Sequence, residues 1–192
     1  MIMAVAAIAG GATYAAYHKE GSVLGATFSN SDNMALKIDQ NPSGAVYDWV
    51  DSFSVLSNYY ITNVRPGSHG EQILDIKNVG NVPGKATIKM TAQADTALYE
   101  DMNFAVSFSP NHDNNFVNVW SGPLTAWNGN AVDLGAITST ATTDGLSGSQ
   151  FSGQTASVKI DWSVPIEAGN EIMGSSVVID TVFGLDSILP TP

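Results

Sequence analysis

The sequence predicts an all-β fold in which two antiparallel sheets stack as a β-sandwich or jelly roll. Apolar and polar residues alternate in one segment after another beyond Tyr17, turn motifs rich in Gly, Pro and Asn separate these segments, and only residues 94–102 have a helical pattern. Strict alternation places one face of a strand on a core and the other in water, which is typical of antiparallel sheets. Two such sheets bury their apolar faces against each other.

The segments that alternate most clearly are expected to be the central strands, with their apolar rows facing the core. These rows are Ala86, Ile88, Met90 and Ala92; Phe104, Val106 and Phe108; Val158, Ile160, Trp162 and Val164; and Val177, Ile179, Thr181 and Phe183. Weaker strands are expected over residues 35–40, 53–64 and 72–77. Trp162 lies in the middle of its row, so we expect its side chain to be buried and structural.

Turn motifs and chain length indicate a single sandwich domain over residues 31–192. The motifs are Asn41-Pro42-Ser43-Gly44, Arg65-Pro66-Gly67, Val82-Pro83-Gly84 and Asn128-Gly129-Asn130. They supply the fixed or positive φ that a chain reversal needs. Residues 138–155, rich in Ser, Thr and Gly, are either a long loop or a flat hairpin. A chain of this length buries roughly 70% of its unfolded surface and needs neither a disulfide nor a metal to fold.

The composition argues against nucleic-acid binding and against electrostatic docking on a membrane. The formal net charge is −11, with only seven Lys and Arg residues in total. Such a surface repels phosphate backbones and anionic lipid headgroups. Only 13% of the residues are charged and cysteine is absent. This composition is more typical of exported β proteins than of cytosolic enzymes.

Residues 1–16 resemble the apolar region and small-residue cleavage zone of a secretory signal peptide. The segment is uncharged, too short and too rich in Ala and Gly to span a bilayer well, and Ala15-Ala16 is the expected cleavage point. A signal peptide also begins with a positively charged region, whereas the first basic residues here are His18 and Lys19. The alternative is a buried N-terminal strand or helix.

We expect no enzyme activity, no catalytic residues, no metal site and no cofactor. The three histidines, His18, His69 and His112, are scattered, and none has the i, i+4 partner of a helical zinc site. His69 is expected in the turn that follows Arg65-Pro66-Gly67. There is no cysteine nucleophile, no Gly-x-Ser-x-Gly elbow and no Gly-rich phosphate loop.

Two clusters have both a functional and a structural explanation. The run Asn111-His112-Asp113-Asn114-Asn115 offers oxygen ligands to Ca²⁺ but lacks the spacing of a calcium loop, so a turn is favoured. The aromatic residues are candidates for a carbohydrate-stacking platform, although core or interface packing is the more common role. These aromatic residues are Trp49, Tyr59, Tyr60, Trp120 and Trp127. Most of the carboxylates fall at outward strand positions or in loops, where we expect them to be solvated.

Three stretches together resemble the TasA/camelysin family of exported matrix-fibre proteins. The first is Gly10-Gly11-Ala12-Thr13-Tyr14-Ala15-Ala16-Tyr17, similar to the cleavage-site run of that family. The second is Gly25-Ala26-Thr27-Phe28 followed by Ala35-Leu36-Lys37-Ile38-Asp39. The third is Val64-Arg65-Pro66-Gly67 leading into Leu74-Asp75-Ile76-Lys77-Asn78-Val79-Gly80-Asn81. Their order and spacing, over nearly half of the chain, carry the resemblance.

The resemblance implies a secreted jelly-roll-like sandwich that forms extracellular fibres of the biofilm matrix. Its extended N-terminal donor strand, residues 17–30, would leave its own body and complete the next subunit, with the polar residues 29–33 as a hinge. The assembly residues are Tyr17, Val23, Leu24, Ala26 and Phe28. The partner would be another copy in a head-to-tail homopolymer, with other matrix or anchor proteins as further partners and no stable membrane span in the mature form.

Camelysin-like members are described as metallopeptidases, but no metal motif in this sequence supports that activity. The alternative to a fibre subunit is a monomeric cell-surface module, either carbohydrate-binding or a camelysin-like metallopeptidase.

Overall fold

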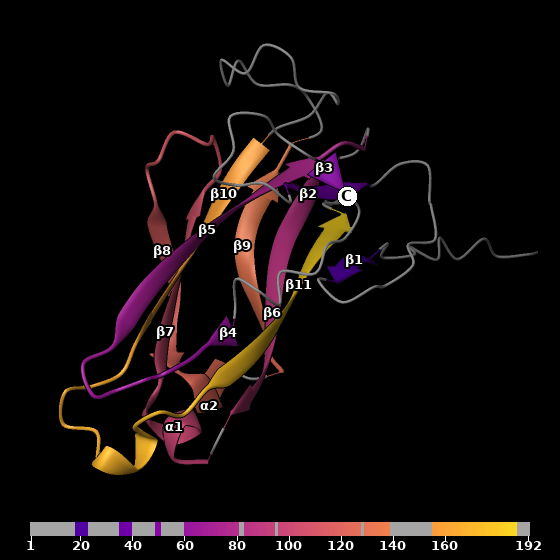
Figure 1. Ribbon diagram of the computed structural model, residues 1–192. Helices are drawn as coiled ribbons and strands as arrows, with labels where there is room; N and C mark the ends of the chain where they lie inside the picture. Colours follow the sequence, from indigo (N-terminus) through magenta and orange to yellow (C-terminus); the bar gives the residue numbers. More distant parts are fainter. Residues whose placement is uncertain are drawn as a thin grey trace, which may run out of the picture.

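The computed structural model describes residues 18–22, 35–39, 49–50, 60–80, 83–94, 96–127, 129–138 and 155–187. These residues form an all-β sandwich of two antiparallel sheets (Figure 1). The predicted all-β sandwich is therefore confirmed. The signal-like residues 1–16, most of the Ser/Thr/Gly-rich stretch and Tyr59 lie outside the described residues. No helix in the described part of the chain has the length and apolarity to cross a membrane.

The first sheet has the strand order β1-β11-β6-β9, with β4 also paired to β11. Its strands are β1 (His18–Ser22), β4 (Tyr60–Ile61), β6 (Gly84–Ala94), β9 (Ala131–Ile137) and β11 (Val177–Ser187). The second sheet has the order β3-β2-β5-β10-β7-β8. Its strands are β2 (Leu36–Asp39), β3 (Trp49–Val50), β5 (His69–Asn78), β7 (Asn103–Ser109), β8 (Val117–Pro123) and β10 (Thr155–Ser163).

The core lies between the two sheets and is built from the predicted apolar rows. The rows of β6, β7 and β11 are buried as expected, because each strand presents alternate residues to the facing sheet. In β10, Val158 and Ile160 are buried, but Trp162 is only half-buried and packs against the edge of the core. Trp162 is therefore less buried than expected, although it packs against the core as a structural residue should.

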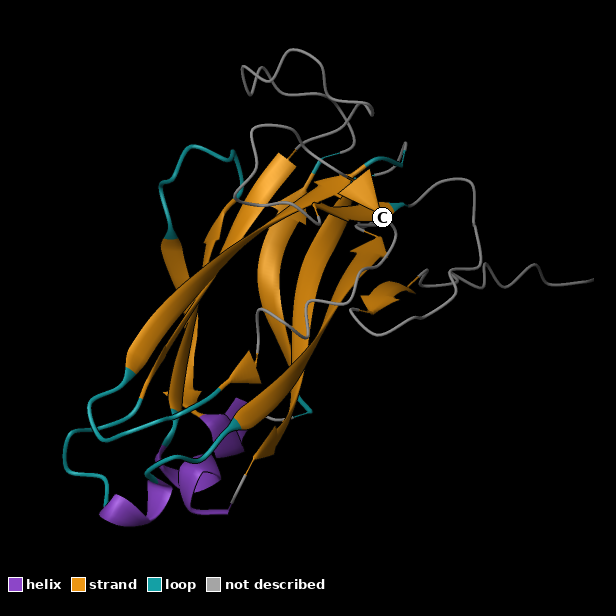
Figure 2. Ribbon diagram, viewed as in Figure 1, coloured by secondary structure: helices purple, strands orange, loops and turns teal. Residues whose placement is uncertain are grey.

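Short helices close one end of the sandwich (Figure 2). The helices are α1 (Thr96–Asp101), α2 (Leu124–Trp127) and the 3-10 helix η1 (Asn170–Ile172). Leu98, Leu124, Trp127 and Ile172 are fully buried at this end. The Leu124 amide donates to the Met102 carbonyl oxygen at 2.8 Å, which ties α2 to the end of α1. The helices thus bury apolar surface that the strand ends would otherwise leave open to water.

Two local predictions were incomplete. Arg65-Pro66-Gly67 does form a turn, with Gly67 at φ 81° and the Ser68 amide donating to the Arg65 carbonyl oxygen at 2.9 Å. However, His69 belongs to the start of β5 rather than to the turn. The structure also contains β8 and β9, which the alternation did not predict.

Candidate functional site

The edge of β11 is the candidate assembly site. On one side β11 pairs along its whole length with β6. On the other side β4 pairs with Val177 and Val178, and β1 pairs with residues 182–186 (Figure 1). Residues 179–181, between these two short strands, have no ladder partner on that side among the described strands. Within the described part of the chain, the long strand β11 is therefore covered on this side by two separate short strands.

The core-facing row of β11 continues through this partly covered edge. Val177, Ile179, Thr181, Phe183 and Leu185 are all buried, whereas the residues between them are only partly exposed or are glycine. Two buried polar atoms here, Asp180 Oδ1 and Thr181 Oγ1, have no hydrogen-bond partner among the described residues. Buried polar groups normally have hydrogen-bond partners, so two such atoms without one indicate that a further hydrogen-bonding group can be accommodated at this edge.

The structure places the predicted donor segment at this same edge, but only in part. Residues 18–22 of that segment form β1, antiparallel to β11 of the same chain, with His18 opposite Asp186 and Ser22 opposite Val182. The predicted assembly residues Tyr17, Val23, Leu24, Ala26 and Phe28 lie outside the described residues, so their role stays a prediction.

The other sheet edges have features that oppose strand addition. β8 and β9 each end their sheet, and each carries a β-bulge, marked by register shifts against β7 and β6. At the bulge in β9 the Gly135 amide donates to Asp133 Oδ1 at 3.1 Å, and in β8 Asn118 Nδ2 donates to the Trp120 carbonyl oxygen at 3.3 Å. Bulges twist an edge away from a partner. At the far edge, the described part of β3 is Trp49–Val50.

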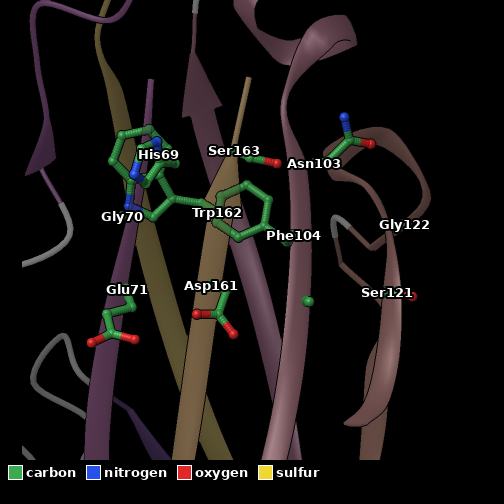
Figure 3. A pocket seen from close by; sticks show the side chains of 11 residues that line it. His69, Gly70, Glu71, Asn103, Phe104, Ser121, Gly122, Asp161, Trp162 and Ser163 are labelled. Carbon is green, nitrogen blue, oxygen red and sulfur yellow. The ribbon is translucent and has the colours of Figure 1, made fainter. Parts of the chain in front are cut away.

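A groove of about 650 Å³ crosses the outer face of the second sheet (Figure 3). Glu71 of β5 is directly opposite Asp161 of β10, Asp161 is opposite Ala105 of β7, and Ala105 is opposite Ser121 of β8. Ala105 forms a low floor between polar walls. His69 and Asn103 also line the groove. It therefore offers hydrogen-bond acceptors to a polar or cationic ligand.

Glu71 and Asp161 are directly opposite each other, and like charges in this position destabilise a strand pair. Lys159 offsets this repulsion by pairing with Asp161. Lys159 Nζ lies 3.1 Å from Asp161 Oδ2, on the side of Asp161 away from Ser163. Nothing in the groove is arranged as a metal centre. Within the ranges that the structure describes, no group of three His, Cys, Asp or Glu residues could hold a metal ion.

A buried polar network lies on the same outer face, toward the other end of the strands. Ser157 Oγ donates to Asp75 Oδ1 at 2.7 Å, and His112 Nδ1 lies 2.7 Å from Ser157 Oγ and 3.3 Å from Asp75 Oδ1. Because the serine proton is given to the carboxylate, Nδ1 must be the donor to the serine oxygen. Asp75, Lys77 and Ser157 are buried there.

This network contains the residue types of a catalytic triad without its arrangement. A nucleophilic serine gives its proton to an imidazole nitrogen, and the other nitrogen faces the carboxylate. Here one nitrogen, Nδ1, faces both partners, and Ser157 is only 1% exposed. The geometry fits a structural role. The expectation that outward-facing carboxylates are solvated was wrong for Asp39 and Asp75, which are buried on this face.

The Asn-rich run forms a side-chain-capped turn, as favoured from the sequence. Asp113 accepts hydrogen bonds from the Ser109 hydroxyl at 2.8 Å and the Asn115 amide at 3.0 Å. These bonds, the serine bond foremost, lower the pKa of Asp113 below its ordinary value. His112 and Asn114 have positive φ, and the turn holds the imidazole over Ser157.

The described tryptophans do not form a carbohydrate-stacking platform. Trp127 is fully buried, and Trp120 packs on it with ring centroids 5.1 Å apart. Trp49 is also buried, with Lys77 Nζ 5.3 Å from its ring centroid. The structural explanation of these aromatic residues therefore holds for the tryptophans.

Comparison with known proteins gives little further information. No family model matches the chain, and no curated protein matches it. Among solved structures, one entitled "Structure of infectious bursal disease virus Gx strain" is similar with a TM-score of 0.29 and 10% sequence identity. The match covers 67% of this chain and 30% of that chain. A likeness this weak carries no argument about fold or function.

Proposed function

We propose that the chain is the structural subunit of a secreted, pilus-like extracellular fibre that assembles by donor-strand complementation. In this proposal residues 1–16 are a signal peptide, residues 17–30 are the donor strand, and residues 31–192 form a jelly-roll-like body. The N-terminal segment of one copy replaces β1 on β11 of the next copy. Because this head-to-tail contact does not close, it grows a filament.

The divided covering of the β11 edge carries the proposal. β1 has only five residues, and its pairing partner in the first sheet is β11. Twelve residues separate Ser22 from Ala35 at the start of the body, which is enough chain to extend about 40 Å. The same backbone hydrogen bonds can therefore be made by a neighbour's segment, which is the arrangement of domain-swapped and strand-added assemblies.

The irregular pairing at the other sheet edges supports the same assembly site. The bulged strands β8 and β9 are poor templates for strand addition. The register of β11 shows no bulge against either β1 or β6. An incoming strand would therefore find at β11 a regular ladder that the described strands cover only in part.

Deletion of residues 17–28 tests this function. We expect a folded, soluble and less stable monomer, because the body keeps its core but loses one edge strand. Electron microscopy and sedimentation of the purified proteins measure assembly, and circular dichroism measures folding. A variant with residues 17–28 in scrambled order is the matched control and should also fail to polymerise. Unchanged filaments from the deletion variant would refute donor-strand exchange.

A monomeric ligand-binding module is the second candidate, favoured by the groove over Ala105. Its polar walls suit the hydroxyl groups of a carbohydrate. Specific binding to a glycan array by a protein that forms no filaments would favour this function over the fibre.

A further inference from the structure

The five residues that pair with β11 as β1 do not include the apolar part of the donor segment. The five residues of β1, His-Lys-Glu-Gly-Ser, include no apolar side chain. Lys19 and Gly21 are opposite Leu185 and Phe183, two buried core residues. The apolar residues of the segment, from Val23 to Phe28, come later in the sequence.

Extending the β1 alignment would place these apolar residues at the wrong positions. Continued pairing from Ser22 opposite Val182 brings Leu24 opposite Asp180 and Ala26 opposite Val178, both outside the core-facing row. It would also run into β4, which already pairs with Val178. A shift by an odd number of residues exchanges the two faces of a strand. Such a shift turns Leu24, Ala26 and Phe28 toward the core.

One odd shift fits the edge without displacing β4. Moving the segment by three residues relative to β1 brings Ser22 opposite Leu185 instead of Val182. Leu24, Ala26 and Phe28 are then opposite Phe183, Thr181 and Ile179, which are all buried members of the core-facing row. The strand ends at Ile179, beside the residues that β4 covers.

The same shift supplies a partner for an orphaned polar atom. It places Thr27 directly opposite Asp180, whose buried Oδ1 has no hydrogen-bond partner in the described structure. A threonine hydroxyl can donate to that carboxylate across the strand pair. In the β1 alignment the residue opposite Asp180 would be Leu24, which has no hydrogen-bond donor in its side chain.

We propose that assembly changes both the copy that supplies the edge strand and the alignment of that strand. Residues 21–28 of a second copy pair with β11, shifted by three residues from the alignment of the chain's own β1. This inference rests on the proposed donor-strand function. Before assembly the polar β1 caps the edge and limits nonspecific strand pairing. In the fibre the second copy's segment replaces it, because that segment adds an apolar row to the core.

Cysteine cross-linking tests the alignment, since the natural sequence contains no cysteine. The S22C/V182C variant reports the β1 alignment, and the G25C/V182C variant reports the shifted one; V182C alone is the control. We expect S22C/V182C to cross-link within the monomer and G25C/V182C to give an intermolecular ladder in filaments. A ladder from S22C/V182C in filaments would show that the exchanged strand keeps the β1 alignment, and would overturn the shift while leaving strand exchange intact.

Matched serine substitutions give a second measurement that does not depend on cross-linking. Leu24→Ser should raise the critical concentration for filament formation by about tenfold or more, because a buried leucine contributes at least that factor to an association constant. Val23→Ser, at a position opposite Gly184 on the outer face, should change it by about twofold at most. The reverse order of effects would overturn the proposed alignment. Filaments that persist after deletion of residues 17–28 would instead refute the underlying donor-strand function.

Discussion

The contact between Gly70 and Trp162 permits a quantitative test of the packing at the end of the core. The two residues are directly opposite each other on β5 and β10. A Cβ atom added at Gly70 would lie 2.7 Å from Trp162 Nε1 and 2.8 Å from Cε2 and Cζ2. Nonbonded atoms do not approach this closely, so the indole ring must move for alanine to fit. The ring lies over Gly70 because this position lacks a side chain.

The expected magnitudes follow from this geometry. Gly70→Ala should lower the free energy of unfolding by about 1–3 kcal/mol, the usual cost of overpacking. Trp162→Ala should cost about 2–3 kcal/mol, less than the roughly 3–5 kcal/mol of a fully buried aromatic residue, because Trp162 is half-buried. In the double variant the clash is absent, and alanine has a better intrinsic strand preference than glycine. The coupling free energy should therefore be about 1–3 kcal/mol, with Gly70→Ala nearly neutral in the Trp162→Ala background.

Urea denaturation followed by far-ultraviolet circular dichroism measures all four proteins without depending on tryptophan fluorescence. Trp120→Ala serves as the control partner, because Trp120 is on β8, three strands away from β5 in the sheet order. Gly70→Ala and Trp120→Ala should be additive within about 0.5 kcal/mol. If Gly70→Ala is equally destabilising with and without the Trp162 ring, the packing argument is refuted.

Two further predictions concern the polar groups on the outer face of the second sheet. Ser157→Ala should lower the free energy of unfolding by about 1–3 kcal/mol, because it removes the hydroxyl donor from the buried Asp75. Ser163→Ala, at an exposed position, should change this free energy by no more than about 0.5 kcal/mol. Equal effects of the two substitutions in chemical denaturation would contradict the network. Asp113 has a lowered pKa, so its contribution to stability is present above the ordinary carboxyl pKa and is lost as pH falls through the folded value. Asp113→Ala should therefore lower the melting temperature at about pH 7, and the difference from wild type should shrink toward about pH 2; a constant difference would count against the turn bonds.

The central strands were predictable because each keeps one unbroken alternation. In β6, β7 and β10 every second residue is apolar, and in β11 the core-facing row is apolar except for Thr181, so the pattern alone identifies the row. β9 breaks this rule. Its buried residues are Val132, Leu134 and Ile137, and the bulge near Gly135 changes the spacing from two residues to three. β8 is an exposed edge strand with its own bulge, so its composition does not show an apolar row.

The outer face of the second sheet was harder to predict, since burial there depends on contacts between distant segments. Asp75 and Ser157 occupy the water-facing positions of their strands by alternation, yet both are buried. His112 reaches them from a turn 45 residues before Ser157 in the sequence. Periodicity describes one strand at a time and contains no information on which turn folds over its outer face.

Under the proposed function, the differences among the sheet edges account for specific polymerisation of a strongly acidic protein. With a formal net charge of −11, two copies repel each other at long range, so weak contacts between faces are disfavoured. An added strand overcomes this repulsion through a row of backbone hydrogen bonds and an apolar row in the core. Among the described strands, the bulges at β8 and β9 disfavour such addition, whereas the pairing of β11 is regular. Under the proposed function, growth then follows a single contact repeated from copy to copy, which yields an unbranched filament rather than an amorphous aggregate.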